Sequence, residues 1–251
     1  YQVRCAMTNY GTDLHFDFTG THKQVGMING GSGAAIAGVM AAILPMLAGD
    51  ITWSSGAVRR LIKLTNPRGT LINSEYPAAC SIASTSAICA VHNCTQATVA
   101  KMLCTLPEHR KRVLAGGGGS WPAMQVMGEN QYGKAFVTQF QEPVAMGFGA
   151  RSWADGVNTA GPYAIPAARM ANVETTELLW PVLVLYRREV IDTGGAGRWR
   201  GGLGANFSFI LHGTSKHLTH VSAAACVAFP AHGGLSGGCP GNACRYLLVR
   251  N

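Results

Sequence analysis

The chain has 251 residues, of which 47% are hydrophobic and 13% are charged, a balance that excludes an intrinsically disordered protein and predicts a folded globular one. Its net charge of +8 comes from scattered basic residues without interleaved aromatic ones, which favours an acidic protein partner or dispersed surface charge over nucleic acid. The longest apolar run, Ala34 to Ala48, falls short of the ~20 residues that a membrane span needs.

The first elements along the chain are a strand and a helix. Residues 12–19 alternate between polar and apolar side chains, which predicts a half-buried strand. The Ala-rich run from Ala34 to Ala48 predicts a buried helix. After the turn formed by Asn66-Pro67-Arg68-Gly69, residues 82–105 predict a second helix that Pro107 ends.

Beyond a four-glycine stretch that ends at Ser120, the sequence becomes rich in strands and turns. Strands are predicted at Val182–Tyr186, Phe207–Leu211, His220–Val227 and Tyr246–Val249, with glycine-dense turns between them. We therefore expect an α+β fold, with helices and strands mixed over residues 1–115 and mostly strands over residues 116–251. The two parts could also form one continuous domain.

The eight cysteines indicate reduced thiols. The sequence has no CxxC pair, and several cysteines lie in apolar runs, where a thiol acts as a small hydrophobic group. Cys239 and Cys244 flank a Pro-Gly turn, so they could also form a disulfide or bind a metal ion. The pattern as a whole predicts a cytoplasmic protein.

Two histidines lie close to Asp17 in the sequence. On a strand, His15 and Asp17 face the same side, so they could work as an acid–base pair, with His22 shortly after them. The alternative is a structural hydrogen bond between a histidine and a carboxylate beneath a turn. His217 and His220 lack a third ligand at a suitable spacing, so no metal site is predicted in this chain.

Two later segments carry further candidates. Arg151, Asp155 and Asn158 form a polar loop of the kind that lines pockets, although Asp155-Gly156 could equally be a simple turn. Glu174 and Glu177 would share one face of a helix, where they could hold a proton or form a salt bridge with Arg187 or Arg188.

The glycine-rich run 194–204 is a candidate anion site. The backbone N–H groups around Gly194, Gly195 and Gly197 can form a concave nest, and Arg198 and Arg200 can add donors for a phosphate or carboxylate. The run lacks the G-K-[ST] ending of a nucleotide-binding loop. A structural turn whose arginines pair with acids at a subunit interface remains the alternative.

Four segments in a fixed order resemble the hydantoinase B/oxoprolinase family, which includes subunits of acetone and acetophenone carboxylases. The third, "DTGGAGRWRGGLG", is the most specific of them, and together they extend over nearly the whole chain. The segments are Asp17-Phe18-Thr19-Gly20-Thr21 with Gln24 and Asn29; residues 66–70 with 76–81; Glu177, Trp180 and Pro181 with 192–204; and residues 234–241.

The resemblance implies an ATP-dependent complex. Members of this family pair with an ATP-binding hydantoinase A-like subunit, so ATP and Mg are expected on that partner. The family's divalent metal (Zn, Mn or Fe) is expected in an N-terminal hydantoinase B-like portion. Because the sequence opens at Tyr1, we expect that portion to be separate, along with possible further small subunits.

Three functions remain open from the sequence. The first is a subunit of a ketone carboxylase, in which an enolate attacks activated CO₂. The second is a hydantoinase or 5-oxoprolinase that opens a lactam or imide ring. The third is a non-catalytic scaffold in such a complex.

Overall fold

The computed structural model describes residues 1–80, 83–118, 123–162, 167–223 and 228–249. Its mixture of helices and three small sheets confirms the α+β prediction. No helix among these residues is long and apolar enough to cross a membrane. In chain order the elements are β1 (Ala6–Asn9), β2 (Leu14–Asp17), α1 (Gly33–Leu47), α2 (Ser55–Arg60), β3 (Ile62–Thr65), α3 (Ala83–Thr105), η1 (Pro107–Arg112), β4 (Ala123–Glu129), β5 (Ala135–Gln139), η2 (Glu142–Val144), α4 (Val173–Leu179), β6 (Val182–Glu189), β7 (Ala205–Leu211) and β8 (Thr219–Ala223).

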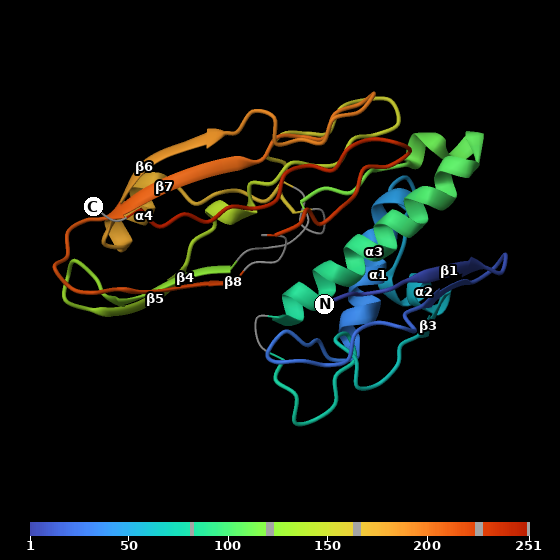
Figure 1. The fold of residues 1–251 in the computed structure, drawn as a ribbon, viewed down its shortest axis with the longest axis horizontal. Helices are drawn as coiled ribbons and strands as arrows, with labels where there is room; N and C mark the ends of the chain where they lie inside the picture. The colour runs from blue at the N-terminus through green and yellow to red at the C-terminus, as the bar shows by residue number, and fades with distance from the viewer. Residues whose placement is uncertain (81–82, 119–122, 163–166, 224–227, 250–251) are drawn as a thin grey trace.

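The first part of the chain packs two long helices beside a three-stranded sheet (Figure 1). In this sheet β2 pairs antiparallel with β1 and parallel with β3. Helices α1 and α3 lie close together because Gly38 has no side chain, and a Cβ atom there would come within 2.7 Å of the Val91 Cβ. The core formed in this way includes the fully buried Phe16, Phe18 and Ile72.

The second part of the chain contains a three-stranded sheet, in the order β5-β4-β8, and the antiparallel pair β6–β7. Met124, Val126 and Phe136 on the sheet form a second apolar cluster with Val182 on β6. The ring of Phe140 lies edge-on to that of Phe209 on β7, with centroids 5.2 Å apart. Apolar packing thus joins the β6–β7 pair to the sheet.

Most of the regular elements predicted from the sequence are present. The helices predicted at 34–48 and 82–105 are α1 and α3, and the strands at 182–186 and 207–211 lie within β6 and β7. Of the strand predicted at 220–227, β8 includes the residues up to Ala223, and residues 224–227 lie outside the described part.

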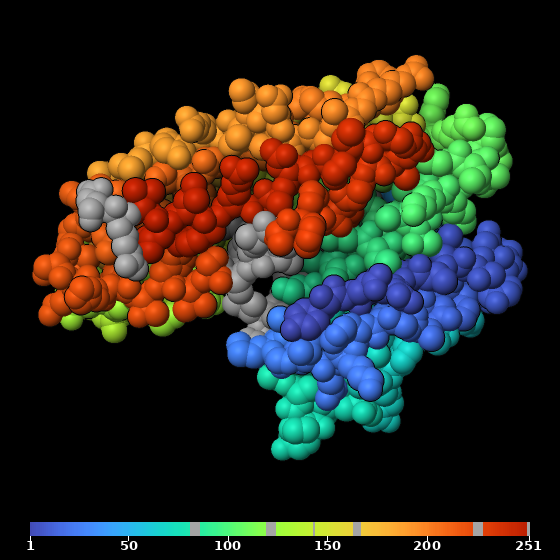
Figure 2. Space-filling view, viewed as in Figure 1, coloured from blue at the N-terminus to red at the C-terminus, as the bar shows by residue number. Residues whose placement is uncertain are grey.

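The strand predicted at Tyr246–Val249 is wrong. This segment forms no regular strand, and Leu247 and Val249 are 80% and 83% exposed. Figure 2 shows the red C-terminal segment spread over the surface of the second part. An apolar run favours extended backbone, but it becomes a strand only where a neighbouring strand offers hydrogen bonds.

The salt bridge that the sequence left open between Glu174 or Glu177 and Arg187 or Arg188 does not form among the described residues. Glu177 lies on α4, as its helical spacing predicted, but its Oε1 accepts the N–H of Val184 at 2.8 Å. Arg187 pairs instead with Glu142, whose side chain is 2% exposed. Glu142 lies in η2, 45 residues before Arg187, so local spacing could not reveal this pair.

Candidate functional site

The polar loop and the glycine-rich run, predicted as separate candidates, form one assembly. Segment 193–204 belongs to the connection between β6 and β7, and segment 145–158 lies beside it (Figure 1). Backbone hydrogen bonds join them, from Gly156 N to Arg200 O at 2.7 Å and from Gly202 N to Phe148 O at 2.8 Å. The structure therefore brings two remote motifs into direct contact.

Asp155 holds the middle of the glycine-rich run in place, at Arg200. Its Oδ1 accepts the backbone N–H of Arg200 at 2.7 Å, and its Oδ2 lies 4.0 Å from the Arg200 Nε. Arg151 donates to the Asp155 carbonyl at 3.2 Å, and its guanidinium stacks 4.7 Å from the ring centroid of Trp153. The carboxylate is half exposed, so it orients Arg200 at the surface.

Asn158 performs the same task further along the run. Its Oδ1 accepts the N–H of Leu203 at 2.9 Å, while its Nδ2 donates to Glu189 Oε2 at 3.1 Å. The side chain therefore connects the end of β6 to the chain that leads into β7. Both polar candidates act here as positioning groups within the fold.

The glycines of the run allow close backbone contacts. A Cβ atom on Gly194 would lie 2.0 Å from Gly201 O, and one on Gly195 would lie 2.2 Å from Cys239 O. Both distances are far below van der Waals contact, so no side chain fits at either position. Gly197 is less confined, with Trp199 O at 3.2 Å from the same added atom.

The structure leaves fewer backbone N–H groups for the anion site that was predicted here. Each backbone N–H from Arg200 to Gly204 already donates within the chain. An anion would therefore have to use residues 194–199 and the arginine side chains. Arg198 is exposed and forms no ion pair with any residue in the described ranges, so its guanidinium is open to a ligand.

The predicted acid–base pair lies on β2. His15 Nε2 is 2.8 Å from Thr65 Oγ1, and Asp17 Oδ1 accepts the N–H of Thr19 at 2.8 Å. The hydrogen bonds from Thr19, followed by the charge of His15, lower the pKa of Asp17 below its ordinary value. His22 is exposed, and its Nδ1 contacts Lys23 O at 2.7 Å.

The two groups of candidates belong to different parts of the molecule. Asp17 and His15 lie on β2 of the first sheet and His22 follows that strand, whereas the polar loop and the glycine-rich run lie next to the β6–β7 pair. No hydrogen bond among the described residues joins the two groups. Each must therefore be tested as a site of its own.

The described residues offer no ligand set for the divalent metal that the resemblance implies. Within these ranges no three His, Cys, Asp or Glu side chains come together in a way that could hold an ion.

One cavity lies outside every predicted site. It opens between α3 and residues 231–235, and His232, Asn93 and Lys101 are among the residues that line it. The weak sequence indication was the spacing of polar residues among small ones on α3. His232 could not be predicted, because nothing near it in the sequence shows that it faces a distant helix.

Comparisons with known proteins agree on one family. The delta subunit of acetophenone carboxylase from Aromatoleum aromaticum is 31% identical over 151 residues, which is 58% of this chain and 21% of that subunit. The structure of nucleotide-free acetone carboxylase matches 96% of the chain with a TM-score of 0.83 and 22% identity. The ATP-dependent caprolactamase of Pseudomonas jessenii matches 88% with a TM-score of 0.76 and 23% identity.

The chain spans only part of each of these proteins, 31% of the acetone carboxylase chain and 37% of the caprolactamase chain. The family model for hydantoinase B/oxoprolinase matches all of residues 1–251. The shared fold places the glycine-rich assembly on the framework common to these enzymes. The chain belongs to the hydantoinase B/oxoprolinase family.

Proposed function

We propose that this chain is part of an ATP-dependent ketone carboxylase. The observation that carries the proposal is the fold shared with acetone carboxylase over 96% of the chain. The identity to the acetophenone carboxylase subunit supports the same branch of the family. In this proposal ATP and Mg belong to a hydantoinase A-like partner, and the remaining hydantoinase B portion completes the enzyme in the cytoplasm.

In the proposed reaction this chain helps to bind an anion. A carboxylase handles bicarbonate, phosphorylated intermediates and a carboxylate product, all of which are anionic. Arg198 is exposed and forms no ion pair within the described ranges, and hydrogen bonds fix the backbone on either side of it, an arrangement suited to bidentate binding of a carboxylate or phosphate. Asp155 positions Arg200 beside it.

A separate role is proposed for the residues on β2. Hydrogen bonds from Thr19 lower the pKa of Asp17 and keep its carboxylate ionised, so it can stabilise positive charge that develops beside it and orient an acid–base partner. This role requires substrate to reach the first sheet, and it does not depend on the role proposed for Arg198. The division into parts 1–115 and 116–251 likewise remains a proposal.

The second candidate function is a cyclic-amide hydrolase. The caprolactamase likeness over 88% of the chain favours it. Such an enzyme also binds a developing carboxylate, so Arg198 would serve in both reactions.

The third candidate is a scaffold without a chemical role. It is favoured by the internal hydrogen bonds that occupy Asp155, Asn158 and the N–H groups of residues 200–204. On this view, changes in these residues would act only through the stability of the fold.

The first test is ATP turnover by the chain purified with its companion chains, whose stoichiometry native mass spectrometry defines. ATP hydrolysis that requires both acetone or acetophenone and bicarbonate is the expected result. Hydrolysis that depends on hydantoin, oxoproline or caprolactam without bicarbonate would assign the chain to the amide branch. A chain that purifies alone would contradict the proposed complex.

Arg198→Gln tests the role of this chain in the reaction. Loss of a bidentate, charge-assisted contact should lower kcat/KM by roughly 10- to 100-fold, while the thermal midpoint stays unchanged because Arg198 supports no other residue. Arg60→Gln, on the exposed helix α2, is the matched control. Full activity of the Arg198→Gln complex would leave the scaffold role as the better description.

A further inference from the structure

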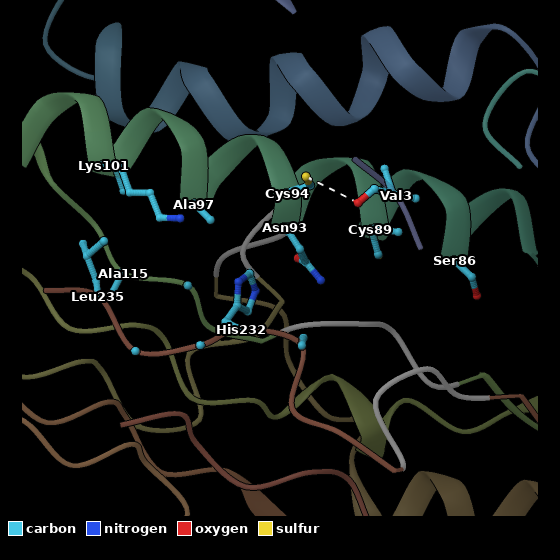
Figure 3. Close-up of a pocket in the computed structure, with 16 residues that line it drawn as sticks. Val3, Ser86, Cys89, Asn93, Cys94, Ala97, Lys101, Ala115, His232 and Leu235 are labelled. Carbon is cyan, nitrogen blue, oxygen red and sulfur yellow. Dashed lines mark hydrogen bonds between the residues drawn. The ribbon is translucent and has the colours of Figure 1, made fainter. Parts of the chain in front are cut away.

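A cavity of about 370 Å³ separates helix α3 from the segment that contains His232. Figure 3 shows Ser86, Asn93, Ala97 and Lys101 along the face of α3 that looks onto this segment. Their spacings of seven, four and four residues place them on one side of the helix. The volume is within the range of pockets that bind small molecules.

His232 forms the opposite wall. Its ring contacts Gly116, where an added Cβ atom would come within 2.1 Å of the imidazole Nδ1. In Figure 3 the side chain points across the cavity toward Asn93 on α3. The contact with Gly116 fixes the ring, so its free edge has one direction, into the cavity.

The Nε2 atom of His232 is buried and has no hydrogen-bond partner within the described ranges. Native proteins pair almost all buried polar atoms, because water is lost on burial and must be replaced. Burial, followed by the nearby His92, lowers the pKa of His232 to about 4, so the imidazole is neutral at pH 7. A neutral imidazole can donate one hydrogen bond through a protonated Nε2.

The charge and polarity of the lining define the ligand. Among the described residues that line the cavity, Lys101 is the single Lys or Arg, it is exposed, and none is Asp or Glu. Ala97 and Leu235 offer apolar surface between the polar groups. One ammonium group matches a single negative charge, whereas a phosphate dianion would be left half neutralised.

The geometry points to a binding site for a small monocarboxylate with a short apolar chain. Lys101 neutralises the carboxylate, His232 Nε2–H donates to one of its oxygens, and the apolar chain packs on Ala97 and Leu235. The site goes beyond the proposed function and does not depend on it, because both ketone carboxylases and amide hydrolases could accommodate it.

The probe for the test is butyrate, titrated into the full chain in the assembly in which it purifies, with butyramide as the uncharged control. Butyrate should bind once per chain with a roughly millimolar dissociation constant, as expected for so few heavy atoms, and butyramide at least about tenfold more weakly. Nuclear Overhauser contacts should connect the butyrate methyl group to the Leu235 methyl groups. Saturable binding without contacts to Leu235 would overturn the assignment.

Three variants separate the contributions. Lys101→Met and His232→Phe should each weaken butyrate binding roughly tenfold, while Ala97→Phe should abolish it by filling the cavity. Lys63→Met, an exposed lysine on β3, is the control and should bind normally. Lys101 is exposed, so its replacement leaves folding intact, and unchanged binding by this variant would refute the site even if the buried variants fail to fold.

Discussion

Gly202→Ala is the change to which the fold should respond most clearly. Gly202 is buried where the polar loop meets the glycine-rich run. An added Cβ would lie 2.1 Å from Val157 O and 3.0 Å from Phe148 N. Both neighbours are backbone atoms, so no side-chain rotation can relieve the contact, and the two segments must move apart by roughly 1 Å.

That separation would break the hydrogen bonds from Gly202 N to Phe148 O and from Gly156 N to Arg200 O, now 2.8 and 2.7 Å long. Each such bond contributes about 1 kcal/mol. Overpacking adds about 1–3 kcal/mol, and the reduced freedom of alanine in the unfolded chain returns up to about 1 kcal/mol. The free energy of unfolding should fall by about 2–5 kcal/mol.

Urea unfolding, followed by circular dichroism and tryptophan fluorescence, measures this change as a shift in midpoint. Gly56→Ala is the matched control, since a Cβ there meets nothing within 4 Å and the residue lies on α2. It should raise stability by up to about 1 kcal/mol. A Gly202→Ala protein within about 0.5 kcal/mol of the parent would refute the close packing of the two segments.

Three further predictions concern stability. Glu142→Ala should lower the free energy of unfolding in urea by about 3–5 kcal/mol, because it leaves the part-buried Arg187 guanidinium without its carboxylate. The double variant Glu142→Leu/Arg187→Met should recover most of this loss, and no recovery would contradict the ion pair as its cause. Because burial keeps the pKa of His232 at about 4, below its unfolded value of about 6.5, its contribution of about 3 kcal/mol is complete above pH 6.5 and is lost as pH falls toward 4. His232→Gln should flatten that part of the pH–stability curve, and the same change at exposed His217 should not; an unchanged slope in His232→Gln would count against the buried neutral imidazole. Asn172→Ala should cost about 1 kcal/mol in thermal unfolding and Asn172→Ser much less, since its Oδ1 accepts the N–H of the third residue of α4 at 2.8 Å; equal losses would show that the cap is not the cause.

Local sequence determined the long helices and the strands of the β6–β7 pair. The Ala-rich run that became α1 and the strand at Val182–Tyr186 carry their preference in neighbouring residues. The strands β4 and β5 were missed because Ala123–Glu129 mixes Met, Gln and Gly without clear alternation. Tyr246–Val249 had the opposite problem, a strand-like composition without a strand beside it.

The sequence by itself also determined the family, through motifs such as residues 192–204, and it pointed to Asp155, Asn158 and Arg198 as residues of interest. Only the tertiary structure decided that Asp155 and Asn158 hold the glycine-rich run by hydrogen bonds that reach 45 residues along the chain. It also decided that the buried Nε2 of His232 faces α3. The physical reason is that helix and strand preferences depend on adjacent residues, whereas the partner of a buried polar group is known only once remote segments have packed together.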